Sequence, residues 1–261
     1  MDLGLQGRCA LVTGASEGIG YATVLALAEE GCDVAFCARR SDELERLARE
    51  VTSRWGRKAV PVRADMSRAD DISEFVSRSA NELGSIDIVV NNAGGSIFGS
   101  FLEVPDERWL ADIELKLLGY VRVARAAIPY MRERGGRIIN VAGNAGKQPL
   151  PYHLPGGAAN AGVLNFTVAL AQQVAEHAIL VLAVAPGPVR TARFERQLNE
   201  LASDWEVSLD EAEQRFLEGL PLGYVPTADE IAGIITFLAS PRAAYMTGTT
   251  VTVDGGITRG I

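Results

Sequence analysis

The sequence has few of the residues that bind metals or form disulfide frameworks. Among its 261 residues there are two histidines, His153 and His177, and three cysteines, Cys9, Cys32 and Cys37. Two histidines are too few for a multi-histidine metal centre, and the cysteine spacing matches neither a disulfide framework nor a zinc site. We therefore expect no metal, and we expect buried, reduced thiols because each cysteine lies in or beside a short apolar run.

The chain also lacks an excess of positive charge. Its 25 Lys and Arg residues are outnumbered by 33 Asp and Glu residues, which gives a net charge of −8 and a pI near 5.0. Such a surface repels nucleic acid and anionic lipid, so the expected partner is a small-molecule substrate. No basic start precedes an apolar stretch, and no apolar run is long enough to span a bilayer. These features predict a cytoplasmic protein with neither nucleic acid nor a membrane as partner.

No Gly/Ser-rich or Pro-rich linker divides the chain, and 48% hydrophobic and 22% charged residues suit one compact domain. Residues 8–40, RCALVTGASEGIGYATVLALAEEGCDVAFCARR, predict a strand, a glycine turn, a helix that ends at Gly31, and a second strand. The further short apolar runs lie at 59–64, 86–90, 137–141, 179–184 and 249–253. This alternation predicts a single α/β domain over 1–261, a Rossmann-like, doubly wound, seven-stranded parallel sheet with helices on both faces.

Three residue pairs match the capping pattern that precedes helices. They are Ser67 with Asp70, Ser208 with Glu211, and Thr227 with Glu230. The connection at about 191–226 contains helical pieces outside the alternation, and such insertions often cover a ligand. We predict that it is a substrate lid.

The segment TGASEGIG at 13–20 joins the first predicted strand to the first predicted helix. Its glycines let the backbone approach a pyrophosphate, while the helix N-terminus faces the negative charge. A glycine turn alone also serves as a simple tight connection, but the surrounding βαβ unit favours a nucleotide. The predicted contacts in this turn are Gly14, Ser16, Glu17, Gly18, Ile19 and Gly20.

Over nearly its full length the chain resembles the short-chain dehydrogenase/reductase family. TGASEGIG resembles that family's glycine motif, NNAG at 91–94 its strand-end motif, APGPVRT at 185–191 its loop for the nicotinamide carboxamide, and MTGTTVTVDGG its C-terminal strand. Asp65 in VRADMS resembles the aspartate that contacts adenine. The resemblance implies a homodimer or homotetramer and a nicotinamide cofactor. The further cofactor contacts that it implies are Asp65, Met66, Asn91, Ala93, Gly94, Pro186, Gly187, Val189 and Thr191.

The end of the second predicted strand bears on the choice between NADP and NAD. Arg39 and Arg40 stand where NAD-preferring proteins place a carboxylate for the ribose hydroxyls. Arginine suits a 2′-phosphate, which predicts NADP. Glu17 opposes this choice, because NADP-preferring members often carry a basic residue there and its charge repels the phosphate. NAD therefore stays the alternative. If the two arginines do not bind a phosphate, they are solvated side chains at the start of the next helix.

The four catalytic positions of the family carry other residues here. In the family a serine orients the carbonyl, a tyrosine supplies the proton, a lysine lowers the tyrosine pKa, and an asparagine anchors a water relay. Alignment on GRIINVAGNAG and ELKLLGYVRVARAAIPYM places Gly143 at the serine, Gly156 at the tyrosine, Asn160 at the lysine and Lys116 at the asparagine. The chain is therefore predicted to be a divergent member whose usual catalytic residues are absent.

Several nearby residues are candidates to replace the missing proton chemistry. Lys116 shares a helical face with Ile113 and Tyr120, which predicts an inward ammonium, although a lysine stem can also snorkel to the surface. The loop KQPLPYHLPGG brings Lys147, Tyr152 and His153 in front of Gly156, where they either enter the site or only pack the loop. The catalytic candidates are Lys116, Tyr152, His153, Asn144 as a carbonyl donor, and Asn160 as a neighbour of Lys116.

Three functions are consistent with this sequence. The intact nucleotide motifs favour an atypical NAD(P)-dependent oxidoreductase that acts on a small organic alcohol or carbonyl. The missing redox acid motivates two alternatives, which are a lyase or isomerase on the same scaffold and a non-catalytic nucleotide-binding or structural subunit. The small residues of GGAANAG at 156–162 leave room for a bulkier substrate, a loop or a partner chain.

Overall fold

The computed structural model, which describes residues 1–95 and 97–259, contains a seven-stranded sheet in the order β3-β2-β1-β4-β5-β6-β7. Every neighbouring pair of strands is parallel. This confirms the predicted sheet and its strand count. The strands are β1 (Cys9–Thr13), β2 (Asp33–Ala38), β3 (Ala59–Arg63), β4 (Ile88–Asn91), β5 (Gly136–Val141), β6 (Ile179–Pro186) and β7 (Thr249–Val253).

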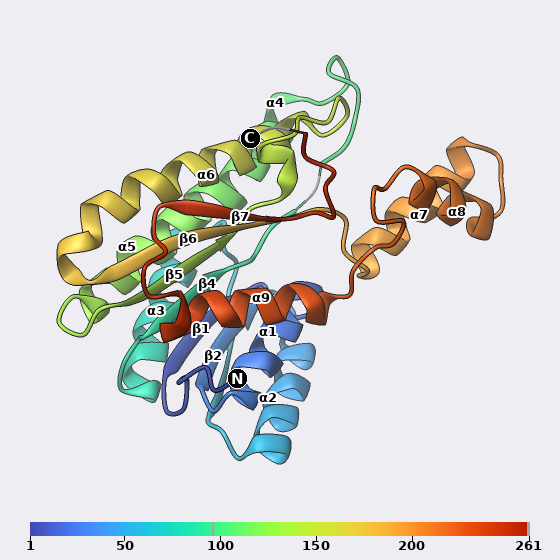
Figure 1. Ribbon diagram of the computed structural model, residues 1–261. Coiled ribbons are helices and arrows are strands. Elements are labelled where there is room, and N and C mark those ends of the chain that lie inside the picture. Colours follow the sequence, from blue (N-terminus) through green and yellow to red (C-terminus); the bar gives the residue numbers. More distant parts are fainter. Residues whose placement is uncertain (96, 260–261) are drawn as a thin grey trace.

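Helices cover both faces of the sheet, as predicted (Figure 1). One face packs against α1 (Gly18–Glu29), α2 (Ser41–Trp55) and α9 (Ala228–Ala239), and the other against α3 (Ala69–Leu83), α5 (Gly119–Met131) and α6 (Leu154–Val174). In β1, Val12 packs into the first layer and Leu11 into the second. Because both faces are buried, central strands such as β1, β2 and β6 are nearly continuous apolar runs.

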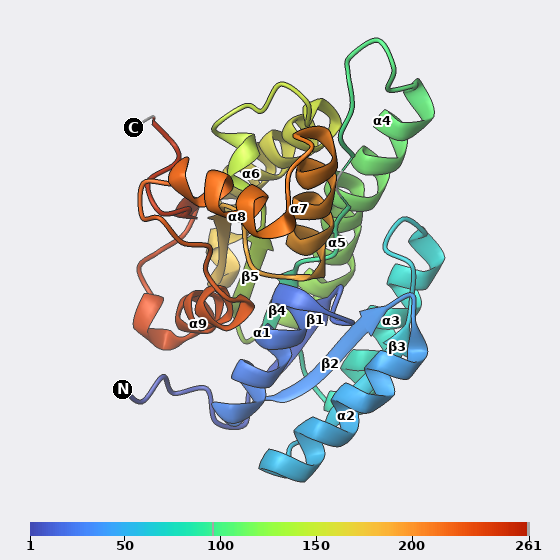
Figure 2. The same cartoon turned by 90° about the vertical axis from the view of Figure 1, so that its right-hand side faces the viewer.

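The remaining helical pieces lie at the carboxyl edge of the sheet or in connections. They are α4 (Asp106–Asp112), a π-helix η1 (Ile113–Leu118), α7 (Ala192–Asp204), α8 (Leu209–Glu218), and three short 3₁₀ turns, η2 (Asn144–Gly146), η3 (Ala175–His177) and η4 (Pro241–Ala243). The pieces α7 and α8 form helices in the segment 191–226, as predicted; they project away from the sheet in Figure 1 and lie in front of it in Figure 2. The strand order reverses between β1 and β4, which is where ligands bind in open α/β sheets.

Two of the three predicted helix caps are confirmed. The Ser208 hydroxyl accepts a hydrogen bond from the Glu211 amide, and Thr227 forms a reciprocal capping box with Glu230. The prediction for Ser67 is wrong, because α3 begins two residues later. The Ser67 hydroxyl instead donates to Asp65 Oδ1 at 2.8 Å and shapes the turn after β3.

The three cysteines are free and buried, as predicted. Burial raises the pKa of Cys32 and of Cys37 to about 12, so both thiols stay protonated at neutral pH. Within residues 1–95 and 97–259, no helix is long and apolar enough to cross a membrane. The same residues contain no group of His, Cys, Asp and Glu side chains that would hold a metal ion.

Candidate active site

The turn after β1 has a backbone that only glycine accommodates. Gly14 adopts φ +70°, and a Cβ added there would lie 2.7 Å from Ala93 Cα. A Cβ added at Gly20 would lie 2.3 Å from the Gly14 carbonyl oxygen, so α1 packs directly on the turn. The Asn92 amide donates to the carbonyl oxygens of Thr13 and Gly14 at 3.1 and 3.0 Å and holds the turn against β4.

The first turn of α1 is open toward the same place. Gly18 adopts φ +60°, and the Glu17 side chain makes no capping hydrogen bond to the helix. A Cβ added at Gly18 would lie 3.2 Å from Thr191 Cγ2, so the loop after β6 closes against this turn. Uncapped N–H groups beside a close backbone approach fit the pyrophosphate of a dinucleotide.

The two arginines after β2 have different surroundings. Arg40 pairs with Glu17 at 3.2 Å and with Glu43 at 3.3 Å, so the Glu17 charge is partly offset within the protein. The Arg39 guanidinium has no ion pair within the described part of the chain. Arg39 is therefore the cation available to an additional phosphate, and Glu17 opposes that phosphate less than its position in the sequence suggests.

The other predicted cofactor residues divide between the surface and the core. Asp65 and Met66 follow β3, and Asp65 Oδ1 accepts from the amide and hydroxyl of Ser67. The Asn91 side chain is fully buried and donates to Asn140 Oδ1 at 2.9 Å inside the sheet, so only the backbone of Asn91 is left for the predicted cofactor contact. The neighbouring residues Ala93 and Gly94 lie at the strand end. The end of β6 supplies Pro186, and the loop after it supplies Gly187, Val189 and Thr191.

Lys116 is buried at 8% exposure, which confirms its predicted inward orientation. It lies on the π-helix η1, a rare wide helical turn that is frequent at functional sites. A Cβ added at Gly94 would lie 3.1 Å from Lys116 Nζ, so the ammonium borders the strand-end motif. Burial, and then Arg193, lower the pKa of Lys116 to about 8, while Asp112 acts in the opposite direction.

Two charged residues that the sequence analysis did not name join Lys116. Asp112 is 2% exposed, and its Oδ2 has no hydrogen-bond partner among the described residues. Burial raises the pKa of the Asp112 carboxyl, although His153, Lys116 and Arg193 favour its charged form. Arg193, from α7, donates to the Gly94 carbonyl at 3.0 Å. Asp112 stands four residues before Lys116, and this helical spacing was a sequence signal for Asp112. Nothing in the sequence of the segment 191–226 marked Arg193.

His153 occupies the space that the small residue at 156 leaves. Its Nδ1 lies 3.1 Å from the Ile97 carbonyl oxygen and its ring stacks on Phe98 at 4.6 Å between centroids. Because a carbonyl only accepts, Nδ1 carries the proton and Nε2 is left as an acceptor. Burial lowers the pKa of His153, which favours this neutral ring. A Cβ added at Gly156 would lie 2.0 Å from His153 Cε1.

Asn160 cross-links β5 to α6. Its Oδ1 accepts from the Gly143 amide and its Nδ2 donates to the Gly156 carbonyl, each at 2.7 Å, and the residue is 5% exposed. Both ends of the side chain are therefore used within the protein. This arrangement gives Asn160 a positioning role for the two glycines rather than a free group for chemistry.

The remaining candidates have surroundings of their own. Asn144 donates to Asp254 Oδ2 at 3.4 Å, and Lys147 donates to Thr252 Oγ1 at 3.0 Å on the surface. Tyr152 is 67% exposed. Of the predicted loop residues, only His153 is thus brought to the buried charges around Lys116.

Asn160→Ala should lower the free energy of unfolding by about 1–3 kcal/mol, because it leaves the partly buried Gly143 amide without its acceptor and removes the side-chain donor to the Gly156 carbonyl. Urea denaturation measures this change. Asn199→Ala is the matched control, since Asn199 also donates to the carbonyl four residues earlier, at 2.7 Å, but on an exposed helix face. Equal losses for the two variants would contradict the cross-link.

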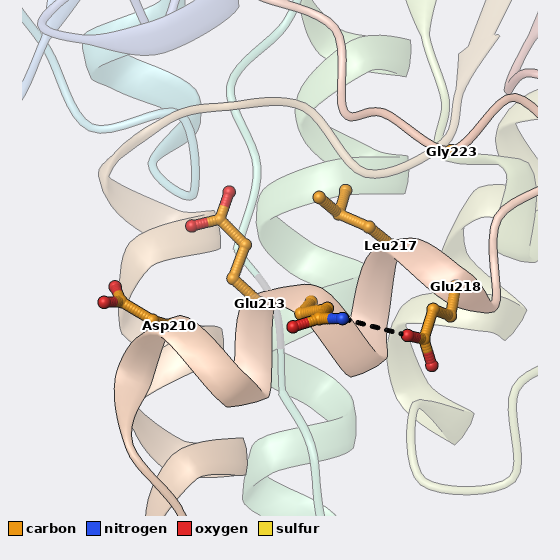
Figure 3. Close-up of a pocket in the computed structure, with 6 residues that line it drawn as sticks. Asp210, Glu213, Leu217, Glu218 and Gly223 are labelled. Carbon is orange, nitrogen blue, oxygen red and sulfur yellow. Dashed lines mark hydrogen bonds between the residues drawn. The ribbon is translucent and has the colours of Figure 1, made fainter.

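The segment 191–226 has a hollow of its own on α8, with a volume of about 440 Å³ (Figure 3). Three of its lining residues are carboxylates, which repel the phosphates of a nucleotide. They are Asp210, Glu213 and Glu218. Arg190 pairs with Glu213 at 2.6 Å and so ties α8 to the loop after β6. This hollow belongs to the segment 191–226 and is separate from the glycine turn.

Comparison with known proteins gives matches over nearly the whole chain. A family model described as enoyl-(acyl carrier protein) reductase matches residues 14–258. The 3-oxoacyl-[acyl-carrier-protein] reductase of Synechocystis sp. is 36% identical over 256 residues, which cover 97% of this chain and 98% of that protein. The solved structure of L-sorbose reductase from Gluconobacter frateurii, complexed with NADPH and L-sorbose, has a TM-score of 0.96 and 32% identity over 100% of both chains. A variant of actinorhodin polyketide ketoreductase with NADPH has a TM-score of 0.93 and 34% identity over 97% of this chain and 98% of that one.

Proposed function

We propose, from the premise that the chain belongs to the short-chain dehydrogenase/reductase family, that it is an NADP-dependent oxidoreductase with a non-standard catalytic site. Its substrate is a small organic alcohol or carbonyl. The observation that carries the proposal is the group of Lys116, Asp112 and His153 beside Gly94, at the edge of a turn that fits a dinucleotide. The relatives named as reductases, and the similar structures complexed with NADPH, support the reaction type and the cofactor.

The chain supplies a place for each part of NADP. The glycine turn and the first turn of α1 would hold the pyrophosphate, Arg39 the 2′-phosphate, and Asp65 the adenine. The loop from Pro186 to Thr191 would hold the nicotinamide carboxamide. When bound, NADPH supplies the hydride that reduces a carbonyl carbon.

Lys116 is the proposed proton donor for the carbonyl oxygen. With a pKa near 8 its ammonium is mostly charged at pH 7 but gives up a proton more readily than an ordinary lysine. Asp112 balances the buried charge, and its carboxyl shares the site with the ammonium. The neutral His153 ring fills the space beside Gly156. Its Nε2 would accept a hydrogen bond from a donor group that enters the site. His153 is thus a positioning residue, and Tyr152, Asn144 and Asn160 are not part of the proposed proton step.

The pH dependence of the reaction should reflect Lys116. The ammonium is the acid for reduction, so kcat/KM for a ketone should fall as the pH rises through about 8, tenfold for each further pH unit. Oxidation of the corresponding alcohol should rise over the same range because the neutral amine is then the base. Initial rates from pH 6 to 10 measure this, with saturating NADPH for the reduction and saturating NADP⁺ for the oxidation. A reduction rate that stays level across pH 8 would contradict the role of Lys116.

Arg39→Ala should weaken NADPH binding about 10- to 100-fold, because it removes a charge-assisted contact to the 2′-phosphate. Binding of NADH, which lacks this phosphate, should change by less than about threefold. Calorimetric titration of the nucleotide-free protein with each cofactor measures both values. Arg78→Ala, which removes an exposed arginine paired with Glu82 on α3, is the control and should change neither. Equal weakening of NADPH and NADH by Arg39→Ala would contradict the NADP assignment.

A further inference from the structure

A second pocket lies at the amino-terminal edge of the sheet, where β1, β4 and β5 begin. Its volume is about 120 Å³, and it is lined by Arg8, Asp87, Arg134 and Arg137 together with the backbone of Gly135 and Gly136. The nucleotide turn lies at the opposite, carboxyl edge of the sheet. Three guanidinium groups thus gather at a place that the proposed reaction does not use.

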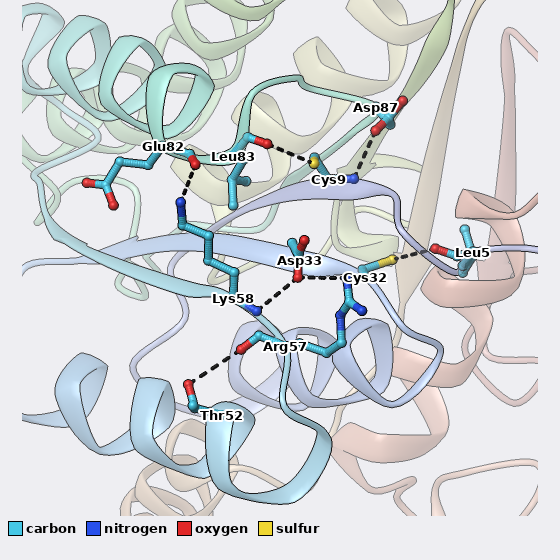
Figure 4. Close-up of polar contacts among 10 residues, drawn as sticks. All are labelled: Leu5, Cys9, Cys32, Asp33, Thr52, Arg57, Lys58, Glu82, Leu83 and Asp87. Atoms are coloured by element: carbon cyan, nitrogen blue, oxygen red, sulfur yellow. Dashed lines mark hydrogen bonds and ion pairs between the residues drawn. The ribbon is translucent and has the colours of Figure 1, made fainter.

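The one carboxylate of this pocket is already engaged. Asp87 Oδ1 accepts from Arg8 at 3.2 Å, and Oδ2 accepts from the Cys9 amide at 2.9 Å and the Ser85 hydroxyl at 3.3 Å. Figure 4 shows Asp87 over the start of β1, with its bond to Cys9. One negative charge therefore faces three positive charges, and Asp87 pairs with Arg8 alone. The charges of Arg134 and Arg137 have no counter-ion in the parts of the chain that the structure describes.

Arg137 carries the clearest sign of a missing partner. Its Nε is buried and has no hydrogen-bond partner within residues 1–95 and 97–259. Burial, and then the nearby charge of Arg8, lower the pKa of Arg137. A buried cationic donor without an acceptor is costly, and so is the approach of two guanidinium groups. An anion between them would remove both costs.

We propose that this pocket binds a small oxyanion, with the chemistry of phosphate or sulfate, between Arg8, Arg134 and Arg137. Guanidinium groups present several N–H donors in a fixed plane and match such oxygens better than they match chloride. The pocket volume admits a tetrahedral oxyanion and excludes a nucleotide. The site is independent of the proposed reaction because it lies at the other edge of the sheet.

Thermal unfolding of the full chain tests this site, in potassium phosphate and in potassium chloride of equal ionic strength. Phosphate should raise the Tm of the wild type by roughly 2–5 °C more than chloride does. Arg134→Gln should lose at least half of this increment. Arg132→Gln is the matched control, since Arg132 is an exposed arginine in the same turn that does not line the pocket, and it should keep the full increment. Both variants change exposed residues, so the fold is kept.

Further comparisons separate specific binding of an anion from general effects of the salt on stability. Phosphate also stabilises proteins by exclusion from their surface, but that effect is shared by the wild type and both variants. Sulfate should act as phosphate does, and planar formate more weakly. The increment should persist with saturating NADPH. An equal increment in the wild type, Arg134→Gln and Arg132→Gln would overturn the proposal, as would its disappearance when NADPH fills the nucleotide site.

Discussion

Lys116→Met should lower kcat/KM for carbonyl reduction by about 10²- to 10⁴-fold, which is the usual contribution of a positioned proton donor. Methionine keeps the length and the apolar stem of lysine but carries no proton to donate. Binding of NADPH should stay within about threefold of the wild type, because the proposed nucleotide contacts come from other residues. Steady-state rates and calorimetric titration measure the two quantities. Lys58→Met, which removes an exposed lysine far from Gly94, is the control and should keep the wild-type rate.

The same variant should be more stable than the wild type. The fold lowers the pKa of Lys116 from 10.5 to about 8, so burial of the charged ammonium destabilises the native state by roughly 3 kcal/mol at pH 7. This cost is full below pH 8, shrinks as the pH rises through 8 toward 10.5, and is absent above 10.5. The stability gained by Lys116→Met should follow the same pH course. A variant that loses both activity and stability would contradict a proton-donor role and indicate a structural one.

Gly156→Ala should lower the free energy of unfolding by about 1–3 kcal/mol and kcat/KM by about 10²-fold, because one methyl group displaces the His153 ring. The new Cβ would lie 2.0 Å from Cε1 and 2.1 Å from Nε2. The ring has to give up its bond to Ile97 and its stacking on Phe98. Chemical denaturation and steady-state rates measure the two losses. Gly157→Ala is the matched control on the same helix, since its Cβ would meet only Ala145 O at an ordinary 3.5 Å.

A double-mutant cycle isolates the contact between Gly156 and the ring. In a His153→Ala background the added methyl group at position 156 has room, so its cost in stability should largely disappear. The activity lost through His153→Ala should not return, because the ring also orients the site. Additive losses in the double variant would mean that the ring and position 156 do not share one space.

The parallel sheet was predictable because periodicity and burial are local features of the sequence. Apolar runs of strand length alternate with helical segments, and helices on both faces make the central strands largely apolar. The glycine turn was predictable because close backbone approach at Gly14 and Gly20 permits no other residue. The Ser67 cap failed for a local reason as well, since Asp65 competes for the same hydroxyl and the helix begins later.

The candidate site was only partly predictable because its members meet through tertiary packing. The helical face of Lys116 predicted its burial, but the π-helical turn that carries it has no sequence signal. His153 and Tyr152 are adjacent in one loop, and only the structure separates the buried ring from the exposed one. Arg193 reaches Gly94 from α7, far along the chain, so no spacing rule connects the two. Asn91 matched the family motif, yet its side chain lies inside the sheet.

The isolated protein should reduce a carbonyl with hydride from NADPH. The most direct test is the ratio of product formed to NADPH oxidised by the pure protein. The ketones are a 3-oxoacyl thioester, L-sorbose and a polyketide, the classes suggested by the names of similar proteins. We expect one product for each NADPH oxidised with at least one of these ketones. Product without loss of NADPH would contradict this expectation in favour of a lyase or isomerase, and NADPH binding without any product would contradict it in favour of a non-catalytic subunit.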